Sequence, residues 1–175
     1  MTRKVKNQDL NRLTVEKYRK VSKTPIILVF DNIRSMHNVG AIFRTCDGFR
    51  IEKILLCGIT ATPPHRDIRK TALGAETTVD WMYYQTTHAA IETLVGCHII
   101  ALEQVKDSVP LRQACIPKNK TIVLIVGNEV DGVDENILGY CDQVVEIPQF
   151  GTKHSFNVSV SAGIALWEIF NKLNE

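Results

Sequence analysis

The sequence predicts an α/β domain with a mainly parallel sheet and helices on both faces. Short apolar runs alternate along the chain with segments in which apolar residues recur at helical spacing, which is typical of strand–helix–strand units. The apolar runs are continuous rather than alternating with polar residues, as in strands that are covered on both faces. A length of 175 residues suits one such domain.

Six segments have the apolar composition expected of strands: 26–30, 53–57, 77–81, 98–102, 121–126 and 143–147. A first helix is expected between Asn38 and Gly48, where four apolar residues follow helical spacing. Three later segments also have helical character: 87–94, 134–140 and 157–173. The order of these elements gives repeated strand–helix units and no internal repeat.

Residues 1–24 are expected to form a basic arm ahead of a domain that spans 25–175. The first 23 residues contain eight Lys and Arg and two acidic residues, so this segment carries a charge of +6 and the rest carries −4. A basic segment on an acidic body suggests a polyanionic partner, although a solvated helix face explains the charge equally well. Leu10, Leu13 and Val21 are expected to form the apolar side of a short helix in the arm.

The composition argues against several classes of protein. The longest apolar run, 122–126, is far shorter than the roughly 20 residues of a membrane helix, and the first residues lack the apolar stretch of a signal peptide. The five cysteines are widely spaced and include no C-x-x-C pair, so neither a zinc ribbon nor a disulfide framework is expected. We therefore expect a cytoplasmic protein with reduced thiols that uses neither a membrane nor a metal.

Polar residues and a glycine follow the first predicted strand, at the kind of position where open α/β sheets bind ligands. Asn38 is a natural N-cap for the next helix, and Gly40 would let a ligand approach the backbone closely. Arg44 lies between apolar positions of that helix, and a partly buried guanidinium requires an anion such as phosphate. The alternative is an ordinary capped helix in which Arg44 pairs with a structural carboxylate.

A second candidate segment, 127–132, directly follows the predicted strand at 121–126. Gly127 and Gly132 flank Glu129 in a tight turn, where this carboxylate can orient an amide or an arginine or serve only as a turn residue. The segment is not G-x-G-x-x-G, contains no G-K-[ST] and lacks the serine of G-x-S-x-G. These features argue against a dinucleotide-binding domain, a P-loop enzyme and a hydrolase.

A third candidate segment runs from Ile147 to Ser159, at the junction between the last strand and the last helix. Ser155 and Asn157 are both good capping residues for that helix. Small residues follow as far as Ala165, and small side chains let another backbone approach closely. This pattern fits close packing between two chains and also fits an ordinary tight core.

The three segments together resemble the SpoU (TrmH-type) RNA ribose 2′-O-methyltransferases of the SPOUT superfamily. The resemblance covers residues 25–173, and its motifs are 32–44, 122–133 and 147–159, with 70–76 also typical of the family. Phe156 stands where leucine is usual in the family, so the pocket for the adenine ring of the family's cofactor is expected to be slightly reshaped.

The resemblance implies a fold that periodicity does not reveal, with a deep C-terminal trefoil knot. It also implies a homodimer in which the second chain completes the site, S-adenosylmethionine as the cofactor, and transfer or ribosomal RNA as the substrate. By the same resemblance, four residues contact the cofactor, largely through backbone groups: Leu102, Gly127, Ile147 and Phe156. Five residues match the family's catalytic positions: Asn38, Arg44, Glu129, Ser155 and Asn157.

Arg44 matches an arginine that has been cast as a general base in the family. Because arginine stays protonated in proteins, we expect Arg44 instead to grip the substrate phosphate and to stabilise developing negative charge, while a phosphate oxygen or water takes the proton. The other four motif residues would orient Arg44, the ribose and the loop. Two alternatives stay open: an RNA-binding protein of this fold without catalysis, and methyl transfer to another RNA acceptor such as a base nitrogen.

Overall fold

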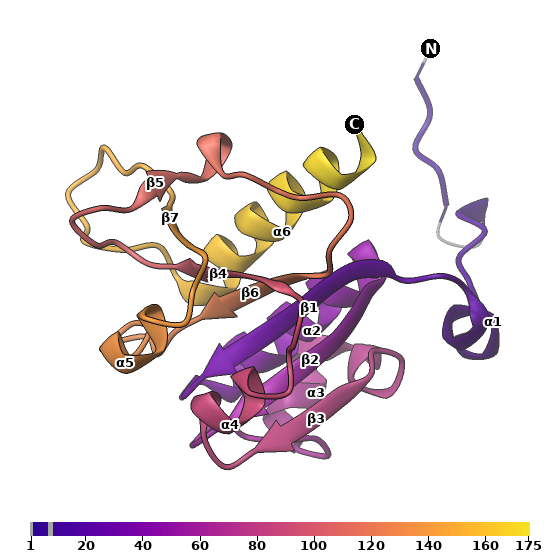
Figure 1. Cartoon of the computed structure of the whole chain (residues 1–175). Helices are drawn as coiled ribbons and strands as arrows, with labels where there is room; N and C mark the ends of the chain where they lie inside the picture. The colour runs from indigo at the N-terminus through magenta and orange to yellow at the C-terminus, as the bar shows by residue number, and fades with distance from the viewer. Residues whose placement is uncertain (1, 7–8) are drawn as a thin grey trace.

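The computed structural model describes residues 2–6 and 9–175, so residues 1, 7 and 8 of the predicted basic arm lie outside the described residues. Within this part of the chain, seven strands form one parallel sheet in the order β3-β2-β1-β6-β4-β7-β5 (Figure 1). The strands are β1 (Thr24–Asp31), β2 (Ile51–Cys57), β3 (Trp81–Tyr84), β4 (His98–Leu102), β5 (Val109–Pro110), β6 (Ile122–Val126) and β7 (Gln143–Glu146). The prediction of an α/β fold with a parallel sheet is therefore confirmed.

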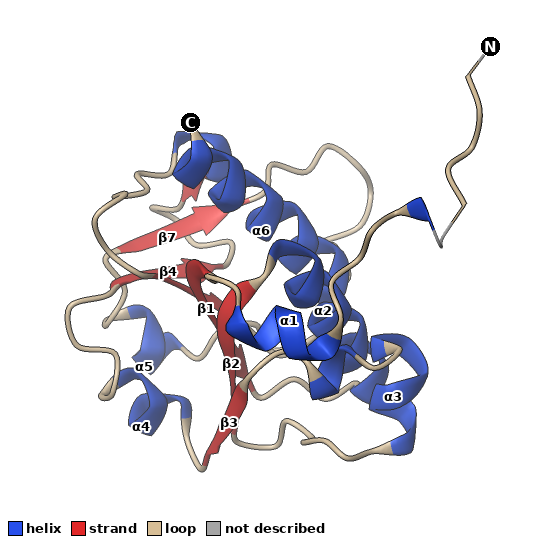
Figure 2. Ribbon diagram, turned by 90° about the vertical axis from the view of Figure 1, so that its right-hand side faces the viewer, coloured by secondary structure: helices blue, strands red, loops and turns tan. Residues whose placement is uncertain are grey.

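Helices cover both faces of the sheet, as predicted (Figure 2). They are α1 (Val15–Lys20), α2 (Met36–Phe49), α3 (Arg66–Ala72), α4 (Thr87–Ile91), α5 (Glu135–Leu138) and α6 (Val158–Asn174). Alternate residues of the central strands feed two separate cores, as the two-residue period of a strand requires. Leu28 and Phe30 of β1 pack with α2, α3 and α6, whereas Ile27 and Val29 pack with α4 and α5.

The third strand lies at 81–84 rather than at the predicted 77–81. The hydroxyl of Thr77 donates to the carbonyl of Gly74 at 2.7 Å, and the backbone N–H of Thr78 donates to the carbonyl of Ala75 at 3.1 Å. These local bonds hold 75–77 in a single 3₁₀ turn, because threonine side chains compete with the strand ladder for backbone groups. Two elements were not predicted: α3, which buries only Ile68 and Ala72, and β5, which has only two residues.

Helix α2 begins two residues before its predicted start, and Ser35 rather than Asn38 is its N-cap. The Ser35 hydroxyl accepts a hydrogen bond from the Asn38 backbone N–H at 3.3 Å, which leaves the Asn38 side chain available elsewhere. The helix also continues through Gly48 and ends only at Arg50, whose φ of 50° is left-handed. The prediction was wrong here because Ser35 offers an equally good cap one turn earlier.

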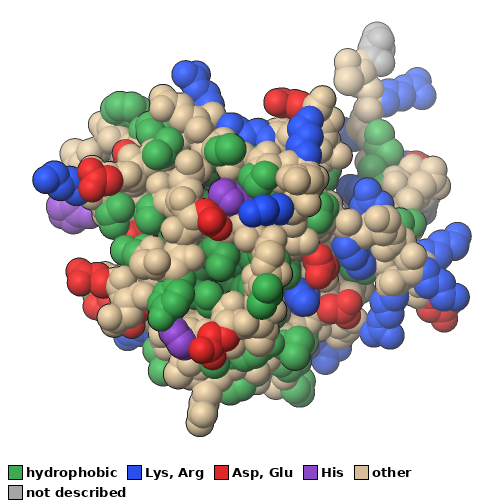
Figure 3. Space-filling view, in the orientation of Figure 1, with side chains coloured by type: hydrophobic (Ala, Val, Ile, Leu, Met, Phe, Trp, Pro, Cys, Tyr) green, Lys and Arg blue, Asp and Glu red, His purple; other side chains and the backbone are tan. Residues whose placement is uncertain are grey.

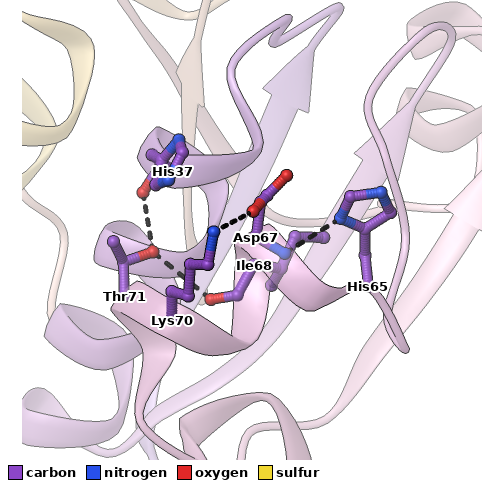
Figure 4. A network of polar contacts seen from close by, with 6 residues as sticks. All are labelled: His37, His65, Asp67, Ile68, Lys70 and Thr71. Atoms are coloured by element: carbon purple, nitrogen blue, oxygen red, sulfur yellow. Dashed lines mark hydrogen bonds and ion pairs between the residues drawn. The ribbon is translucent and has the colours of Figure 1, made fainter.

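Gly40 lets two helices pack closely and does not face a ligand, which corrects the prediction made for it. A Cβ at this position would lie 2.2 Å from the carbonyl oxygen of Ile68 and 2.2 Å from the hydroxyl of Thr71. The Thr71 hydroxyl donates to the carbonyl of His37 at 2.9 Å and so ties α3 to the first turn of α2 (Figure 4). The segment 70–76 thus has a packing role in this fold.

Among the described residues of the arm, the α-helix is α1, which Thr14 caps. Leu10 and Leu13 precede this helix and are exposed, so the predicted apolar face is wrong. The residue that anchors the arm is Tyr18, whose ring is buried in the core on the α2 side of the sheet. Lys23 covers that ring with its ammonium group 3.3 Å from the ring centroid and donates to the Tyr18 carbonyl at 2.6 Å.

Candidate active site

A cavity of about 450 Å³ opens at the carboxyl ends of β4, β6 and β7. Its size is within the usual range for small-molecule sites. All four residues that the resemblance assigned to the cofactor line it: Leu102, Gly127, Ile147 and Phe156. Parallel pairing explains this convergence, because Leu102 is level with Val126 on one side and with Val145 on the other.

The turn after β6 forms one wall of the cavity and folds back on itself. The backbone of Asn128 exchanges two hydrogen bonds with Gly132, at 2.9 and 3.0 Å. A Cβ on Gly127 would lie 2.1 Å from the carbonyl carbon of Gly132, so only glycine fits this close approach. The Asn128 side chain also donates to the carbonyl of Asn32 at 2.8 Å, which fixes the turn against the end of β1.

The cavity lining is acidic. Its charged residues are Glu103, Glu129, Asp131 and Glu146, and no Lys, Arg or His lines it among the described residues. The carboxylate of Glu103 accepts hydrogen bonds from the backbone N–H groups of Gln104 and Val133, at 2.7 and 2.8 Å. An acidic, partly enclosed site favours a ligand that carries positive charge.

Three of these acidic residues were not singled out from the sequence: Glu103, Asp131 and Glu146. A signal was present, because Glu103 directly follows β4 and Glu146 ends β7. The ends of parallel strands are the usual place for binding residues in such sheets. No motif was expected after the strand at 98–102, so the acidic residue that directly follows it, Glu103, was missed.

A continuous line of hydrogen bonds joins the three predicted motifs at the mouth of the cavity. The side-chain amide of Asn38 donates to Glu129 at 2.8 Å. The Asn38 side-chain oxygen in turn accepts a bond from the Asn157 amide at 3.1 Å. The structure therefore brings together three of the five predicted catalytic residues.

Glu129 is the most constrained carboxylate of the site. Besides Asn38, the backbone N–H groups of Arg34 and Ser35 donate to it, at 2.9 and 3.0 Å. Burial acts to raise the pKa of this carboxyl, but the bonds from Arg34, Asn38 and Ser35 outweigh it, so the pKa of Glu129 is lowered. Glu129 is thus held as an anion that binds the start of α2 to the turn after β6.

The loop between β7 and α6 positions the last two predicted residues. Asn157 is the N-cap of α6, and its side-chain oxygen accepts bonds from the Ser159 backbone and hydroxyl, at 2.9 and 2.6 Å. Ser155 does not cap the helix; it is exposed and lines the cavity. Gln104 ties this loop to the end of β4 by donating to the carbonyl of His154 at 3.0 Å.

Arg44 stands apart from the other predicted catalytic residues. It is exposed, does not line the cavity, and makes no hydrogen bond or ion pair with the described residues. The expectation of a partly buried guanidinium was therefore wrong: Phe43 and Cys46 point into the core, and the helical turn directs Arg44 to the surface. It lies six positions after Asn38, which is about 9 Å along the axis of α2.

Two of the small residues of α6 face the core. Ala162 and Ala165 are fully buried, which supports the tight-core interpretation of this pattern. On the outer face of α6, an apolar stripe of Val160, Ile164 and Trp167 is exposed to the extent of 50%, 38% and 55%. These three residues share one side of the helix, because they are four and three positions apart.

The helices of the described residues are too short or too polar to cross a bilayer. Over the same residues, His, Cys, Asp and Glu side chains form no group of three or more that could hold a metal ion.

Comparison with known proteins identifies the family to which this site belongs. The model of the SpoU rRNA Methylase family matches residues 25–167. The chain is 33% identical over 150 residues to the 23S rRNA (guanosine-2'-O-)-methyltransferase RlmB of Neisseria meningitidis, covering 85% of this chain and 59% of that protein. It is 30% identical over 151 residues to the tRNA (guanosine(18)-2'-O)-methyltransferase of Aquifex aeolicus, covering 82% of this chain and 67% of the relative.

Solved structures give the same result. The TrmH/SpoU tRNA modifying enzyme of A. aeolicus superposes with a TM-score of 0.80 at 27% identity, covering 91% of this chain and 82% of that one. The AdoMet-bound rRNA methyltransferase of Sinorhizobium meliloti superposes with a TM-score of 0.79 at 25% identity, covering 89% of this chain and 60% of that one. The family match leaves out the basic arm but spans most of the chain and includes all three motif segments. The chain therefore belongs to the SpoU rRNA methylase family.

Proposed function

We propose that this chain transfers a methyl group from S-adenosylmethionine to the 2′-oxygen of a ribose in RNA, either transfer or ribosomal RNA. The observation that carries the proposal is the hydrogen-bonded line from Glu129 through Asn38 to Asn157, placed at the mouth of an acidic cavity. Relatives named as ribose methyltransferases of both RNA classes support it.

The residues of the cavity fit S-adenosylmethionine. The cofactor carries a sulfonium, an ammonium and a carboxylate group, so its net charge is positive, which suits an acidic lining without Lys, Arg or His among the described residues. Leu102, Ile147 and Phe156 would enclose the adenine ring, and the bare backbone at Gly127 would allow close approach. When bound, the cofactor supplies an electrophilic methyl group.

Each motif residue then has a role that follows from its contacts. Glu129 is saturated with hydrogen bonds and has a lowered pKa, so it is a poor proton acceptor and acts by orienting Asn38. Asn38 and Asn157 hold each other in a single orientation, and Ser155 offers a hydroxyl at the cavity. Arg44, which is free of partners in the described residues, would grip the RNA phosphate and stabilise negative charge on the ribose oxygen.

We further propose that the chain forms a homodimer and that its C-terminal third is knotted. The likeness to SpoU structures supports the knot. The apolar stripe of α6 supports the dimer, since exposed apolar patches mark interfaces. A second copy on this stripe would also lie beside α2, because Phe49 of α2 packs 6.0 Å from the Trp167 ring. Arg44 would then lie near the interface, where a second copy completes the site.

The division into a basic arm (1–24) and a methyltransferase domain (25–175) is also part of the proposal, supported by a family match that begins at residue 25. The arm would add cations to the RNA-binding surface. We place the protein in the cytoplasm, consistent with five cysteines that are all unpaired.

The decisive experiment combines cofactor binding with product identification. Calorimetry should detect binding of S-adenosylmethionine, and incubation with RNA from cells that lack this gene should give one new 2′-O-methylated nucleoside after digestion. A methylated base in the digest would move the reaction to a base nitrogen. RNA binding without cofactor binding would identify the chain as a non-catalytic RNA-binding protein.

A further inference from the structure

Helix α3 presents two chemically different sides. Ile68 and Ala72 are buried against the core, and Thr71 is bonded to α2 (Figure 4). The opposite side carries Arg66, Arg69 and Lys70, all exposed. The outer side of α3 is therefore a stripe of three cations.

These cations line an open cleft of about 840 Å³, here called the α3 cleft, whose other walls include Pro64, His65 and Trp81. Arg66 and Arg69 make no side-chain hydrogen bond or ion pair with the described residues, whereas Lys70 pairs with Asp67 at 2.7 Å. The one acidic residue of the lining, Glu76, is already engaged by the Gly74 backbone N–H at 3.0 Å. The cleft therefore holds two guanidinium groups without a side-chain partner among the described residues, and its lining carries net positive charge.

The cationic surface continues from the cleft onto the basic arm. The Arg19 guanidinium of α1 donates to the carbonyl of Thr77 at 3.0 Å, and Thr77 itself lines the α3 cleft. Lys17 and Lys20 lie on the same short helix and are exposed. Figure 3 shows Lys and Arg side chains gathered on the side of the molecule where α1 lies.

Aromatic side chains stand beside these cations. Trp81 begins the edge strand β3 and is only partly buried. Tyr83 lies two residues on, so it shares a face of the strand with Trp81, and it is 48% exposed. Cations next to exposed aromatic rings are typical of sites for single-stranded nucleic acid, in which phosphates meet the cations and unstacked bases stack on the rings.

We infer that the α3 cleft binds a single-stranded stretch of the RNA substrate, with phosphates on Arg66 and Arg69 and a base stacked on Trp81. The identity of the RNA rests on the proposed function. The cleft lies across one helix from α2, which carries Arg44, and a helix is about 10 Å wide. A strand whose ribose is presented near Arg44 can therefore cross α3 and reach the cleft within a few nucleotides.

The test measures binding of a labelled oligouridylate to the full chain by fluorescence anisotropy. The Arg66→Gln/Arg69→Gln variant should bind at least about tenfold more weakly, and the slope of log affinity against log salt should become shallower by about 1.4, as expected for two lost phosphate contacts on a single strand. The matched control is Lys118→Gln/Lys120→Gln, which removes the same charge from two exposed lysines just before β6 that do not line the α3 cleft, and should leave both quantities unchanged.

Stacking is tested through tryptophan fluorescence. The chain has two tryptophans, so a Trp167→Phe variant leaves Trp81 as the only reporter. Oligouridylate should quench its emission, and Trp81→Leu should weaken binding about tenfold. Equal affinity and quenching with oligoglutamate would overturn the assignment to RNA in favour of an acidic peptide.

The outcomes separate this inference from the proposed function. If the cleft variants bind oligouridylate with wild-type affinity and salt dependence while the protein still methylates RNA, the cleft inference is overturned and the function stands. If the protein methylates nothing but the cleft variants lose RNA affinity, the cleft stands and the enzymatic proposal fails.

Discussion

The side-chain amide of Asn157 donates a hydrogen bond to the side-chain oxygen of Asn38 at 3.1 Å, although 119 positions separate the two residues. Each of them also holds a second partner: Asn38 donates to Glu129, and Asn157 accepts from Ser159. The start of α2, the turn after β6 and the start of α6 are thereby locked together. Because Glu129 can only accept and Asn157 accepts from the α6 backbone, the side-chain amides of Asn38 and Asn157 are each held in one orientation.

The first prediction concerns the anionic end of this line. Glu129→Gln removes the negative charge and replaces one of the two carboxylate oxygens that accept from three N–H groups with an N–H donor, so we expect the free energy of unfolding at neutral pH to fall by about 1–3 kcal/mol. Methyl transfer should fall at least about tenfold, because the orientation of Asn38 is lost.

The pH dependence of this effect has a defined sign. The pKa of Glu129 is lowered in the folded protein, so its stabilising contribution is present above the unfolded value of about 4.3 and is lost as the pH falls through the folded value. Urea unfolding at neutral pH and at progressively lower pH should show the difference between wild type and Glu129→Gln shrinking in acid. Asp107→Asn, which neutralises an exposed loop carboxylate, is the control; an equal loss there would contradict a specific role for Glu129.

The parallel sheet could be predicted from sequence for one physical reason. Continuous apolar runs such as 122–126 must be covered on both faces, and the helices between them make the strands parallel. Parallel strands end at a common edge, and the order β6-β4-β7 then places Leu102, Gly127 and Ile147 close together; the sequence predicted their shared site only through the family resemblance.

Details that depend on competition between equivalent residues could not be predicted. Ser35 and Asn38 are both good caps, and only the packing of α2 decides that Asn38 keeps its side chain for Glu129. Gly40 is equally compatible with a nearby ligand and a nearby helix, and only the unpredicted α3 resolves this. Arg44 is exposed because the helical rotation of about 100° per residue turns its side chain away from the core. The apolar residues next to it in the sequence do not show this.

The second prediction concerns the tight turn of the cavity wall. In Gly127→Ala, the new methyl group would meet the backbone of Gly132 and Val133 at 2.1–2.2 Å, and backbone cannot move aside as a flexible side chain can. We expect the free energy of unfolding to fall by about 1–3 kcal/mol and affinity for S-adenosylmethionine to drop at least about tenfold. Thermal unfolding and calorimetry measure these effects.

Gly48→Ala is the matched control for that substitution. Gly48 lies inside α2 with open space around the position of a Cβ, so alanine there should be neutral or should stabilise the helix by about 0.5–1 kcal/mol. Equal destabilisation by both variants would show that the close approach at Gly127 is not the cause.

The third prediction concerns the apolar stripe of α6. Ile164→Asp places a charge at the centre of the stripe, so the proposed dimer should dissociate and methyl transfer should fall with it. Sedimentation or light scattering measures the change in mass. Val95→Asp, at an isolated apolar residue that is 91% exposed, should leave the mass unchanged. A wild-type protein that is monomeric under assay conditions would refute the proposed dimer.

The fourth prediction concerns the basic arm. Removal of residues 1–13 deletes four cations and leaves Tyr18 in its core position, so the fold should be retained. RNA affinity should fall and its salt dependence should become shallower, because fewer counterions are released on binding. Affinity for S-adenosylmethionine should not change. If RNA affinity is unaltered at several salt concentrations, the cations of the arm do not bind RNA and only keep a helix face solvated.

The last prediction concerns the exposed arginine of α2. Arg44 makes no bond with the described residues, so Arg44→Ala should change the free energy of unfolding by no more than about 0.5 kcal/mol. Cofactor affinity should be kept, because Arg44 does not line the cavity, whereas methyl transfer should be abolished. Arg44→Lys keeps the charge without the planar fork and should recover only part of the rate. Stability, calorimetry and turnover measured on the same three proteins decide the matter: near-normal turnover in Arg44→Ala would refute the assigned role.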